Sequence, residues 1–566
     1  MFLPTTRKEM NKLGWEQCDV IVVSGDTYID SSYIGAAVIG RVLENAGYKV
    51  GIIAQPDIST DEDIRRLGEP KLFWGVTAGA VDSMVANYTA SKKKRRSDDF
   101  TPGGENTKRP NRASIAYTNL IKQNFKNTKP IVLGGIEASL RRVPHYDYWT
   151  NKIRKSILFN AKADILVYGM GEKTILDIAK KLKKGETTDN IRGICYISKE
   201  KRYNYIELPS FEEVKKDKLK FIDMFNVFYK NNDPKTAKGL IQLQDTRYLI
   251  QNPPQIYMSK EKLDEVYSYD YERDVHPYYK KDGDVKAMNT IKFSLTSHRG
   301  CYGECSFCAI AIHQGRTVRS RSQESIVNEA KKFTRDKRFK GNIMDVGGPT
   351  ANMYEIECEK KLKYGACENK KCLYPEKCSE LNVNHSKQIE LLKKLDNIDG
   401  IKKVFVASGI RYDMIAKDKK YGEKYLNEII GKHTSGQMKV APEHTQDNVL
   451  AKMGKPGSKY LKDFKDKFYE LNKKNGKKQF LTYYLIAAHP GCSEKDMKEL
   501  KKYASAELKS NPEQVQIFTP TPSTYSTLMY YTEMDPFTKE KVFVEKDMGK
   551  KIKQKQIVVN KGRRKK

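Results

Sequence analysis

Three cysteines stand close together near the middle of the 566-residue chain. Cys301, Cys305 and Cys308 form a C-x3-C-x2-C pattern, and thiolate is the preferred protein ligand of iron–sulfur clusters. Three thiolates can bind three irons of a 4Fe-4S cluster, which leaves the fourth iron open to a substrate or cofactor. Gly303 gives the loop the backbone freedom to bring the sulfurs together. The triplet therefore predicts an iron–sulfur cluster with an open coordination position.

Zinc is the alternative metal for this triplet. A structural zinc ion takes four ligands, usually as two pairs of the C-x2-C type. Cys305 and Cys308 make one such pair, and a partner can come from His298 or His313. A triplet of free structural thiols is the least expected alternative, because the three cysteines lie within eight residues between a predicted strand and a predicted helix.

A second cysteine group follows, with C-x8-C-x4-C-x5-C spacing and His385 nearby. Four thiolates can hold a structural zinc ion or an auxiliary cluster, so the group predicts a second metal. The alternative is a surface loop with four reduced thiols, which would be prone to oxidation. The remaining cysteines stand alone beside apolar segments, and we expect them to be small buried residues: Cys18, Cys195 and Cys492. The second group consists of Cys358, Cys367, Cys372 and Cys378.

The elements around the triplet alternate between strand and helix. Apolar runs predict strands at residues 292–296, 342–346, 403–407, 437–440, 480–486 and 514–518, with helical periodicity between them. Six βα units predict an incomplete (β/α)6 barrel over residues 286–522, with a cysteine-rich insertion at 355–385. Chemistry in such a barrel lies at the C-terminal ends of the strands. Those ends carry Gly347-Gly348, Arg411, Glu443, His444 and His489. A lone histidine is more often a hydrogen-bonded structural residue, so we assign a catalytic role to none.

The first part of the chain predicts another α/β domain. Short apolar runs at residues 19–24, 50–54, 72–76, 131–133 and 165–168 predict buried parallel strands separated by helices. We expect a doubly wound, Rossmann-like domain over residues 1–200. The polar stretch 91–112 predicts a surface loop, or alternatively a loop that folds over a ligand. Residues 201–285 predict a helical connector, and residues 523–566 a basic C-terminal extension whose end, 561–566, is frayed.

Net charge and hydropathy limit the classes of partner and the cellular location that we expect. The chain has 104 Lys and Arg against 71 acidic residues, a formal net charge of +33, which attracts polyanions such as nucleic acid. Because the charge is spread along the chain, a general compositional bias is the simpler interpretation. We find no apolar run that would span a bilayer and no secretory signal at the start. We therefore expect a cytoplasmic, reducing location, in which the cysteines are thiols or metal ligands.

The triplet, with Phe307 directly before its last cysteine, resembles the signature of the radical S-adenosylmethionine (radical SAM) family. The resemblance implies that the amino and carboxylate groups of SAM bind the open iron, and that Phe307 packs near the adenine. It further implies that Gly347 and Gly348 meet the SAM amino group, although Pro349 replaces the usual acidic residue. Arg411 and Glu443 can face the SAM carboxylate and ribose; the alternative is an ordinary salt-bridge role at the barrel rim.

The resemblance is closer to the YgiQ-type radical SAM proteins. It rests on the runs SGDTYIDSSYIG, LGGIEASLRR, SHRGCYGECSFCAIAIHQGRTVRSRS, DVGGPTANMY, KVAPEHT and QIFTPTPST, so it extends from about Asp19 to Tyr525. It implies an enzyme that cleaves SAM reductively and modifies an unknown substrate by radical chemistry. A reductant such as a flavodoxin or ferredoxin would supply the electron. The alternatives are methylthiolation or methylation of a tRNA or protein, a nucleic-acid- or protein-binding module with structural metals, and an electron carrier.

The front domain also resembles the cobalamin-binding domains that precede some radical SAM barrels. A D-x-H-x-x-G motif would supply a histidine to cobalt. Here Asp30 and Gly35 are present, but Ser32 stands at the histidine position and cannot replace imidazole. Either cobalamin binds without a protein ligand, or the fold has been kept and the cofactor lost. The second alternative is favoured.

Overall fold

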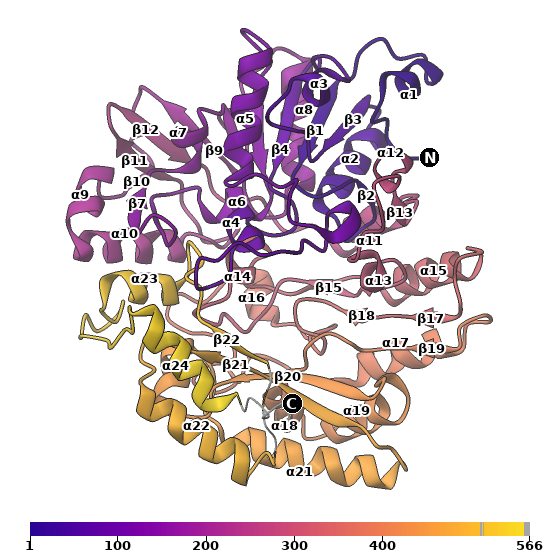
Figure 1. Ribbon diagram of the computed structural model, residues 1–566, viewed down its shortest axis with the longest axis vertical. Coiled ribbons are helices and arrows are strands. Elements are labelled where there is room, and N and C mark those ends of the chain that lie inside the picture. Colours follow the sequence, from indigo (N-terminus) through magenta and orange to yellow (C-terminus); the bar gives the residue numbers. More distant parts are fainter. Residues whose placement is uncertain (510–511, 513, 560–566) are drawn as a thin grey trace, which may run out of the picture. The chain divides into compact units, whose positions relative to one another are not determined.

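Runs of β-branched residues form the central strands of the N-terminal half. A computed structural model describes residues 1–509, 512 and 514–559, and the chain divides into two compact units, Met1–Lys292 and Phe293–Lys566 (Figure 1). In the first unit, β1 (Val20–Ser24) and β3 (Val50–Ala54) are buried at every position, as expected of parallel strands covered on both faces. Helix α2 (Gly35–Asn45) packs against both strands.

The first unit contains a nine-stranded sheet of order β10-β11-β12-β9-β8-β5-β4-β1-β3. The run from β3 to β8 is parallel, and β9, β12 and β11 continue it with antiparallel pairing. The further strands are β2 (Ile29–Asp30), β4 (Phe73–Thr77), β5 (Ile131–Gly134), β6 (His145–Asp147), β7 (Lys152–Arg154), β8 (Ile165–Val167), β9 (Ile194–Ser198), β10 (Ile206–Glu207), β11 (Leu240–Gln244), β12 (Arg247–Gln251) and β13 (Asp274–Val275).

Helices cover both faces of this sheet. Helices α2 and α8 contact each other, whereas α5 contacts α3 and α7, so two helical layers enclose the sheet. The further helices are α1 (Arg7–Lys12), α3 (Glu62–Arg65), α4 (Ser83–Asn87), η1 (Pro102–Gly104), α5 (Ala113–Asn124), α6 (Gly135–Leu140), α7 (Ile157–Ala161), α8 (Glu172–Lys183), α9 (Phe211–Lys216), α10 (Lys218–Lys230), α11 (Lys260–Ser268), α12 (Pro277–Lys280) and α13 (Met288–Ile291).

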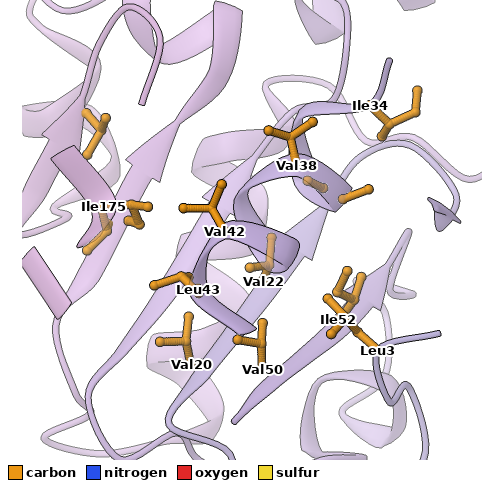
Figure 2. Close-up of a cluster of buried hydrophobic side chains, with 14 of the residues drawn as sticks. Leu3, Val20, Val22, Ile34, Val38, Val42, Leu43, Val50, Ile52 and Ile175 are labelled. Atoms are coloured by element: carbon orange, nitrogen blue, oxygen red, sulfur yellow. The ribbon is translucent and has the colours of Figure 1, made fainter. Parts of the chain in front are cut away.

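The core of the first unit lies between α2, α8 and the sheet. Figure 2 shows Val38, Val42 and Leu43 of α2 above Val20 and Val50 of the neighbouring strands. Burying a side chain of this size contributes roughly 1.5–3 kcal/mol to folding. The alternate residues of β1, Ile21 and Val23, are also buried but belong to the opposite face. The predicted doubly wound domain is confirmed.

The helical connector predicted for residues 201–285 is confirmed at α9 and α10 but wrong at residues 206–207 and 240–251. Strands β10, β11 and β12 lie there and extend the sheet of the first unit. The physical reason is that Gln242, Gln244 and Gln251 are almost fully buried and find hydrogen-bond partners, so no apolar alternation marks these strands.

The second unit is an open arc of parallel strands in chain order. β14 pairs with β18, β17 pairs with β19, residue Ile410 bridges to Val440 of β20, and β20, β21 and β22 form one sheet. This is the predicted incomplete barrel, since each of the six predicted strand segments neighbours the next, while β15 and β16 form a separate antiparallel hairpin. The strands are β14 (Leu295–Thr296), β15 (His298–Arg299), β16 (Arg319–Ser320), β17 (Asn342–Ile343), β18 (Val346–Gly347), β19 (Lys403–Val404), β20 (Gln437–Glu443), β21 (Phe480–Ala487) and β22 (Val515–Ile517).

Helices accompany these strands as expected of βα units. The residues after 523 add α23 and α24, and α24 packs against α22 and β22, so this segment is part of the second unit rather than a free extension (Figure 1). The predicted frayed end, 561–566, lies outside the described residues. The helices are α14 (Ile310–His313), α15 (Gln323–Thr334), α16 (Glu359–Tyr364), α17 (Ser386–Asp396), α18 (Tyr412–Lys417), α19 (Gly422–Glu428), the π-helix η2 (Ile429–His433), α20 (Asp447–Met453), α21 (Lys459–Lys474), α22 (Glu494–Ala506), α23 (Tyr525–Thr532) and α24 (Met548–Val558).

Across the described part of the chain, no helix combines the length and the apolar character needed to cross a bilayer.

Candidate functional site

The cysteine triplet lies on a loop between β15 and α14 of the second unit. β15 pairs with β16, and this hairpin fixes the start of the loop at Gly300. Gly300 has a φ of 80°, and a Cβ atom there would lie 2.3 Å from the carbonyl oxygen of Thr317. Only glycine combines this backbone conformation with such a close approach. The loop is therefore held firmly at its entry, directly before Cys301.

The sulfurs of Cys301 and Cys305 both face Gly303. The Gly303 N–H donates to Cys301 Sγ over 3.3 Å. A Cβ on Gly303 would lie 3.3 Å from Cys301 Sγ and 3.6 Å from Cys305 Sγ. All ten cysteines are free thiols, and Cys18, Cys195 and Cys492 are buried as predicted. The loop thus presents reduced thiols around a space that lacks a side chain.

Burial dominates the chemistry of these thiols. It raises the pKa of Cys301, and it raises the pKa of Cys308 to about 12; the charge of Cys305 adds to both effects. The sulfurs of Cys301 and Cys305 lie on the same side of Gly303, so their charges act on each other at short range. Iron binding replaces the thiol protons, which compensates for the cost of burying thiolates.

The spacing of the sulfurs favours a cluster over one zinc ion. Tetrahedral ligation at a Zn–S distance of about 2.3 Å places sulfurs about 3.8 Å apart. Within the described residues, no three cysteine or histidine ligand atoms lie within 4.8 Å of one another. The thiolates of a 4Fe-4S cluster each bind a different iron, so they can lie farther apart. The triplet therefore fits a cluster.

Arg411 follows the third barrel strand and faces these thiols. Its Nε and Nη2 donate to the two carboxylate oxygens of Asp413 over 2.8 and 2.5 Å. Its Nη1 donates toward Cys305 Sγ over 3.8 Å. Burial alone would lower the pKa of Arg411, but Asp413 and the thiols raise it overall. Asp413 thus fixes a permanent cation beside the cluster loop, with one nitrogen directed at the sulfurs.

Glu443 ends β20 and completes the same site. Its φ of 67° is unusual for a residue with a side chain. Burial raises the pKa of Glu443, while Lys455, 3.8 Å away, and Arg411 counteract that rise. The charge of Glu443 in turn contributes to the raised pKa of Cys308. The structure therefore brings Arg411 and Glu443 together with the triplet.

The glycine pair Gly347-Gly348 lies against β14 and His298. The Gly347 carbonyl already accepts from the N–H and the hydroxyl of Ser297, over 2.7 and 3.1 Å. A Cβ on Gly348 would lie 2.6 Å from His298 Nε2, so glycine is required there. Thr350, two residues later, lies 3.6 Å from Cys301 Sγ through its hydroxyl oxygen. The loop after the glycines thus reaches the cluster loop.

Phe307 points toward α20 and the end of β21. It is half-buried against a hydrophobic cluster that includes Val449 and Leu485. Its ring lies edge-on to His489, with 6.3 Å between the ring centroids. Phe307 therefore lines the site on the side of the later barrel strands, away from the glycine pair on β18.

Sequence reasoning missed a buried charged network beneath the cluster loop. Lys361 Nζ lies 3.5 Å from Glu304 Oε1, 2.5 Å from the Arg316 carbonyl and 3.5 Å from Cys372 Sγ. Lys371 donates to the carbonyl of Glu304 over 3.1 Å. These residues are up to 67 positions apart in sequence, and lysines in a Lys-rich segment carry no signal of burial. The network connects the cysteine-rich insertion to the cluster loop.

The second cysteine group is partly buried in this insertion. Cys358 and Cys372 belong to one hydrophobic cluster with Tyr302 and Met414. Burial raises the pKa of Cys372 to about 11, and Lys361 counteracts part of that rise. Among the described residues, no three of the four sulfurs lie within 4.8 Å of one another. A second metal at Cys358, Cys367, Cys372 and Cys378 stays a prediction.

In the first unit, the segment that resembles the cobalamin motif makes its contacts with other residues of the same unit. Asp30 is buried and ion-paired with Arg41, and it pairs with Asp274 in the β2–β13 ladder. Ser32 is 5% exposed, so its side chain is enclosed by the unit itself. These residues therefore have structural roles within the unit and do not present a ligand for cobalt.

Ligands of doubly wound sheets bind at the carboxyl ends of the strands, where the strand order reverses. Here that point lies between β1 and β4. The predicted surface loop at residues 91–112 is exposed at residues 92–97, but its later part turns inward and places Arg109, whose side chain is 0% exposed, at this point. Arg109 pairs with Asp26 and Asp98 over 2.7 and 2.9 Å and donates to the Ala78 carbonyl over 2.6 Å. The residues present do not fit a corrinoid at this crevice.

Known proteins resemble the chain over its full length. The radical SAM N-terminal family matches residues 2–294, and the radical SAM superfamily matches residues 295–504. A UPF0313 protein of Fusobacterium nucleatum subsp. nucleatum is 63% identical over 566 residues, which is 100% of both chains. A UPF0313 protein of Thermotoga neapolitana is 50% identical over 570 residues, again 100% of both. The chain belongs to the UPF0313 family of radical SAM proteins. The YgiQ-type resemblance is thereby confirmed.

Two solved radical SAM structures share the fold. The radical SAM methyltransferase TsrM from Kitasatospora setae, solved with tryptophan and a SAM analogue, has a TM-score of 0.51 at 13% identity, covering 89% of this chain and 74% of its own. The cobalamin-dependent SAM radical enzyme OxsB, solved with aqua-cobalamin, has a TM-score of 0.50 at 13% identity, covering 92% of this chain and 55% of its own. At this identity the likeness concerns the fold alone. It confirms the predicted order of a Rossmann-like, cobalamin-binding-like domain before a radical SAM barrel.

Proposed function

We propose that this chain cleaves SAM reductively at a 4Fe-4S cluster bound by Cys301, Cys305 and Cys308, and then modifies a substrate by radical chemistry. The observation that carries the proposal is the arrangement around Gly303, where two thiols and the Nη1 of Arg411 surround the same space. When bound, the cluster supplies the electron that cleaves a carbon–sulfur bond of SAM. An external reductant, of the flavodoxin or ferredoxin class, is the proposed electron source.

The residues of this chain have separate tasks in the proposal. The three thiolates bind iron and leave one coordination position open. Arg411, held in place by Asp413, is placed to receive a carboxylate through Nη1. Because the Gly347 carbonyl already accepts two hydrogen bonds, the rest of the Gly347-Gly348 loop would bind the amino group of SAM. Glu443 would accept from the ribose, and Phe307 would pack near the adenine.

The test measures 5′-deoxyadenosine. The protein is purified without oxygen, its iron and sulfide are reconstituted, and SAM and a strong reductant are added. We expect product from the parent chain and background levels from the Cys301→Ala/Cys305→Ala/Cys308→Ala variant. Cys195→Ala is the matched control, because Cys195 is a buried free thiol in the sheet of the first unit. Equal product from the triple variant, or an intact 4Fe-4S signal in it, would contradict the proposal.

We also propose that the first unit binds no cobalamin. What supports this is the fully buried Arg109 at the crevice, together with the engagement of Asp30 by Arg41. After incubation with hydroxocobalamin and desalting, we expect no corrinoid absorbance to remain with the protein. A stoichiometric corrinoid spectrum would refute the proposal.

A further inference from the structure

A second group of potential metal ligands lies where two helical segments of the barrel end. Asp396 is the last residue of α17, Glu428 is the last residue of α19, and His433 is the last residue of η2. Their ligand atoms all lie within 4.8 Å of one another. Among the residues that the structure describes, this is the one group of three or more histidine, cysteine or acidic side chains so arranged.

The imidazole of His433 is oriented as in a metal ligand. Its Nδ1 lies 2.8 Å from the Val404 carbonyl, which can only accept, so Nδ1 carries the proton. Nε2 then presents a lone pair. The side chain is 0% exposed, and Nε2 has no hydrogen-bond partner among the described residues. A histidine whose other nitrogen donates to a backbone carbonyl is the usual arrangement around protein-bound metals.

The two carboxylates face this lone pair. Asp396 Oδ2 lies 3.7 Å and Glu428 Oε1 3.9 Å from His433 Nε2. Both distances are too long for a hydrogen bond, so neither carboxylate occupies the Nε2 lone pair directly. Ligands at about 2.0–2.2 Å from a tetrahedral zinc ion lie roughly 3.4 Å apart. The observed separations are close to that value, and a cation between the three groups would satisfy them all.

We propose that Asp396, Glu428 and His433 form a divalent transition-metal site. Imidazole with two carboxylates suits zinc and neighbouring first-row ions, whereas an all-oxygen set would suit magnesium or calcium. Asp396 and Glu428 are 27% and 15% exposed, so an ion can enter from solvent and keep a water ligand. The ion would connect α17, α19 and η2 to the start of β19, at the strand end opposite Arg411. It therefore stabilises the barrel and takes no part in the cluster chemistry.

One cation already competes for this position. Lys432 Nζ lies 3.1 Å from Glu428 Oε1, and the Lys432 side chain is 58% exposed. An exposed ion pair of this kind contributes little to stability and can be displaced. Removing Lys432 should therefore strengthen metal binding, whereas a site built only for the Lys432–Glu428 ion pair predicts no such gain.

The test is zinc stoichiometry on the full chain loaded with its iron–sulfur cluster. The protein is dialysed without oxygen against buffered Zn²⁺, and zinc and iron per chain are measured. His433→Asn is the informative variant, because the asparagine amide can still donate to the Val404 carbonyl but offers no Nε2. We expect the parent to retain one zinc more than this variant at equal iron content. Any zinc on the second cysteine group contributes equally to both.

Three further variants keep the result decisive. Lys432→Met should bind this zinc about 2- to 5-fold more tightly than the parent, as expected for losing one competing charge. Asp396→Asn, whose side chain is partly exposed, replaces His433→Asn if the latter does not fold. Glu423→Gln, on α19 but outside the group, should match the parent. Equal zinc in the parent, His433→Asn and Asp396→Asn would overturn the proposal.

Discussion

Gly303 leaves the space between two thiols of the cluster loop unfilled. A methyl group there would lie 3.0 Å from Arg411 Nη1 as well as close to both sulfurs. Its backbone is not in the left-handed region, so alanine is excluded by the neighbours and not by conformation. The glycine is therefore required because the site needs volume for iron and sulfide.

We expect Gly303→Ala to lower 4Fe-4S loading several-fold, because the added methyl occupies part of the space between the sulfurs and Arg411. Iron and sulfide per chain after anaerobic reconstitution measure the effect. Gly409→Ala is the matched control, since nothing lies within 4 Å of a Cβ at that position. Full loading of Gly303→Ala would show that the sulfurs do not converge on this space.

Single residues differ in how far their roles can be predicted from sequence. The positions of the triplet, Arg411 and Glu443 near one another were predictable, because these residues lie at or near the ends of strands with clear apolar patterns, and their roles stay predictions. Asp413 was not, since its role depends on the direction of the Arg411 side chain. The Glu304–Lys361 contact joins residues that are 57 positions apart, and no local pattern reports such a pairing.

At the scale of elements, the cysteine-rich insertion supports the cluster loop from below. α16 carries Lys361, whose ammonium group is buried between Glu304, Cys372 and the Arg316 carbonyl. Arg316 also lies 3.5 Å from Glu304. The free energy of such a buried charge depends strongly on the positions of its partners, because the charged groups must stay paired to offset the hydration that they lose on burial. The insertion and the loop should therefore lose order together.

Lys361→Met removes the buried cation and leaves part of the Glu304 charge uncompensated. We expect a destabilisation of about 3–5 kcal/mol, with reduced cluster loading. Denaturant unfolding and iron content of the purified variant measure both. Lys360→Met is the control, because Lys360 is exposed on the same helix. A stable, fully loaded Lys361→Met protein would mean that Glu304 and Arg316 hold the loop without the insertion.

Element boundaries were most predictable where strands are apolar throughout. The strand predicted at residues 50–54 coincides with β3. For five of the six predicted barrel strands, an observed strand starts within one residue of the predicted first residue. β11 and β12 were missed because buried glutamines interrupt their apolar residues. Long-range hydrogen bonds, such as Arg142 Nε to Gln251 Oε1 over 3.1 Å, make those glutamines stable in the sheet. The periodicity of apolar residues does not reveal such long-range hydrogen-bond partners.

At the scale of the whole molecule, burial of neutral histidines makes stability depend on pH. Burial lowers the pKa of His298 and His444 to about 4 and that of His489 to about 3. Unfolded histidine has a pKa near 6.5. The unfolded chain therefore binds more protons than the folded chain between about pH 6.5 and 4, and the free energy of unfolding falls as pH falls through that range.

His444→Asn isolates one of these contributions, because the asparagine oxygen can still accept from the Gln446 N–H that His444 Nδ1 now binds over 3.0 Å. Between pH 7.5 and 5.0, we expect the parent to lose about 2 kcal/mol more unfolding free energy than the variant. Denaturant titrations at both pH values measure the difference between the parent and the variant. Carboxyl groups with raised pKa values are present in both proteins, so their contribution cancels in this difference. An equal loss in both proteins would show that His444 titrates normally.

The packing of α24 has a consequence for how the protein is made. Val558 of this last described helix belongs to the same hydrophobic cluster that supports Phe307, and Gln554 accepts from the Ala488 N–H over 3.0 Å. Ribosomes deliver the chain from its N-terminus at about 5–20 residues per second, so the cluster thiols emerge on the order of ten to fifty seconds before α24 does. During biosynthesis the thiols therefore emerge while the apolar wall behind Phe307 is still incomplete. The apolar cluster that packs against Phe307 is complete only after α24 has emerged.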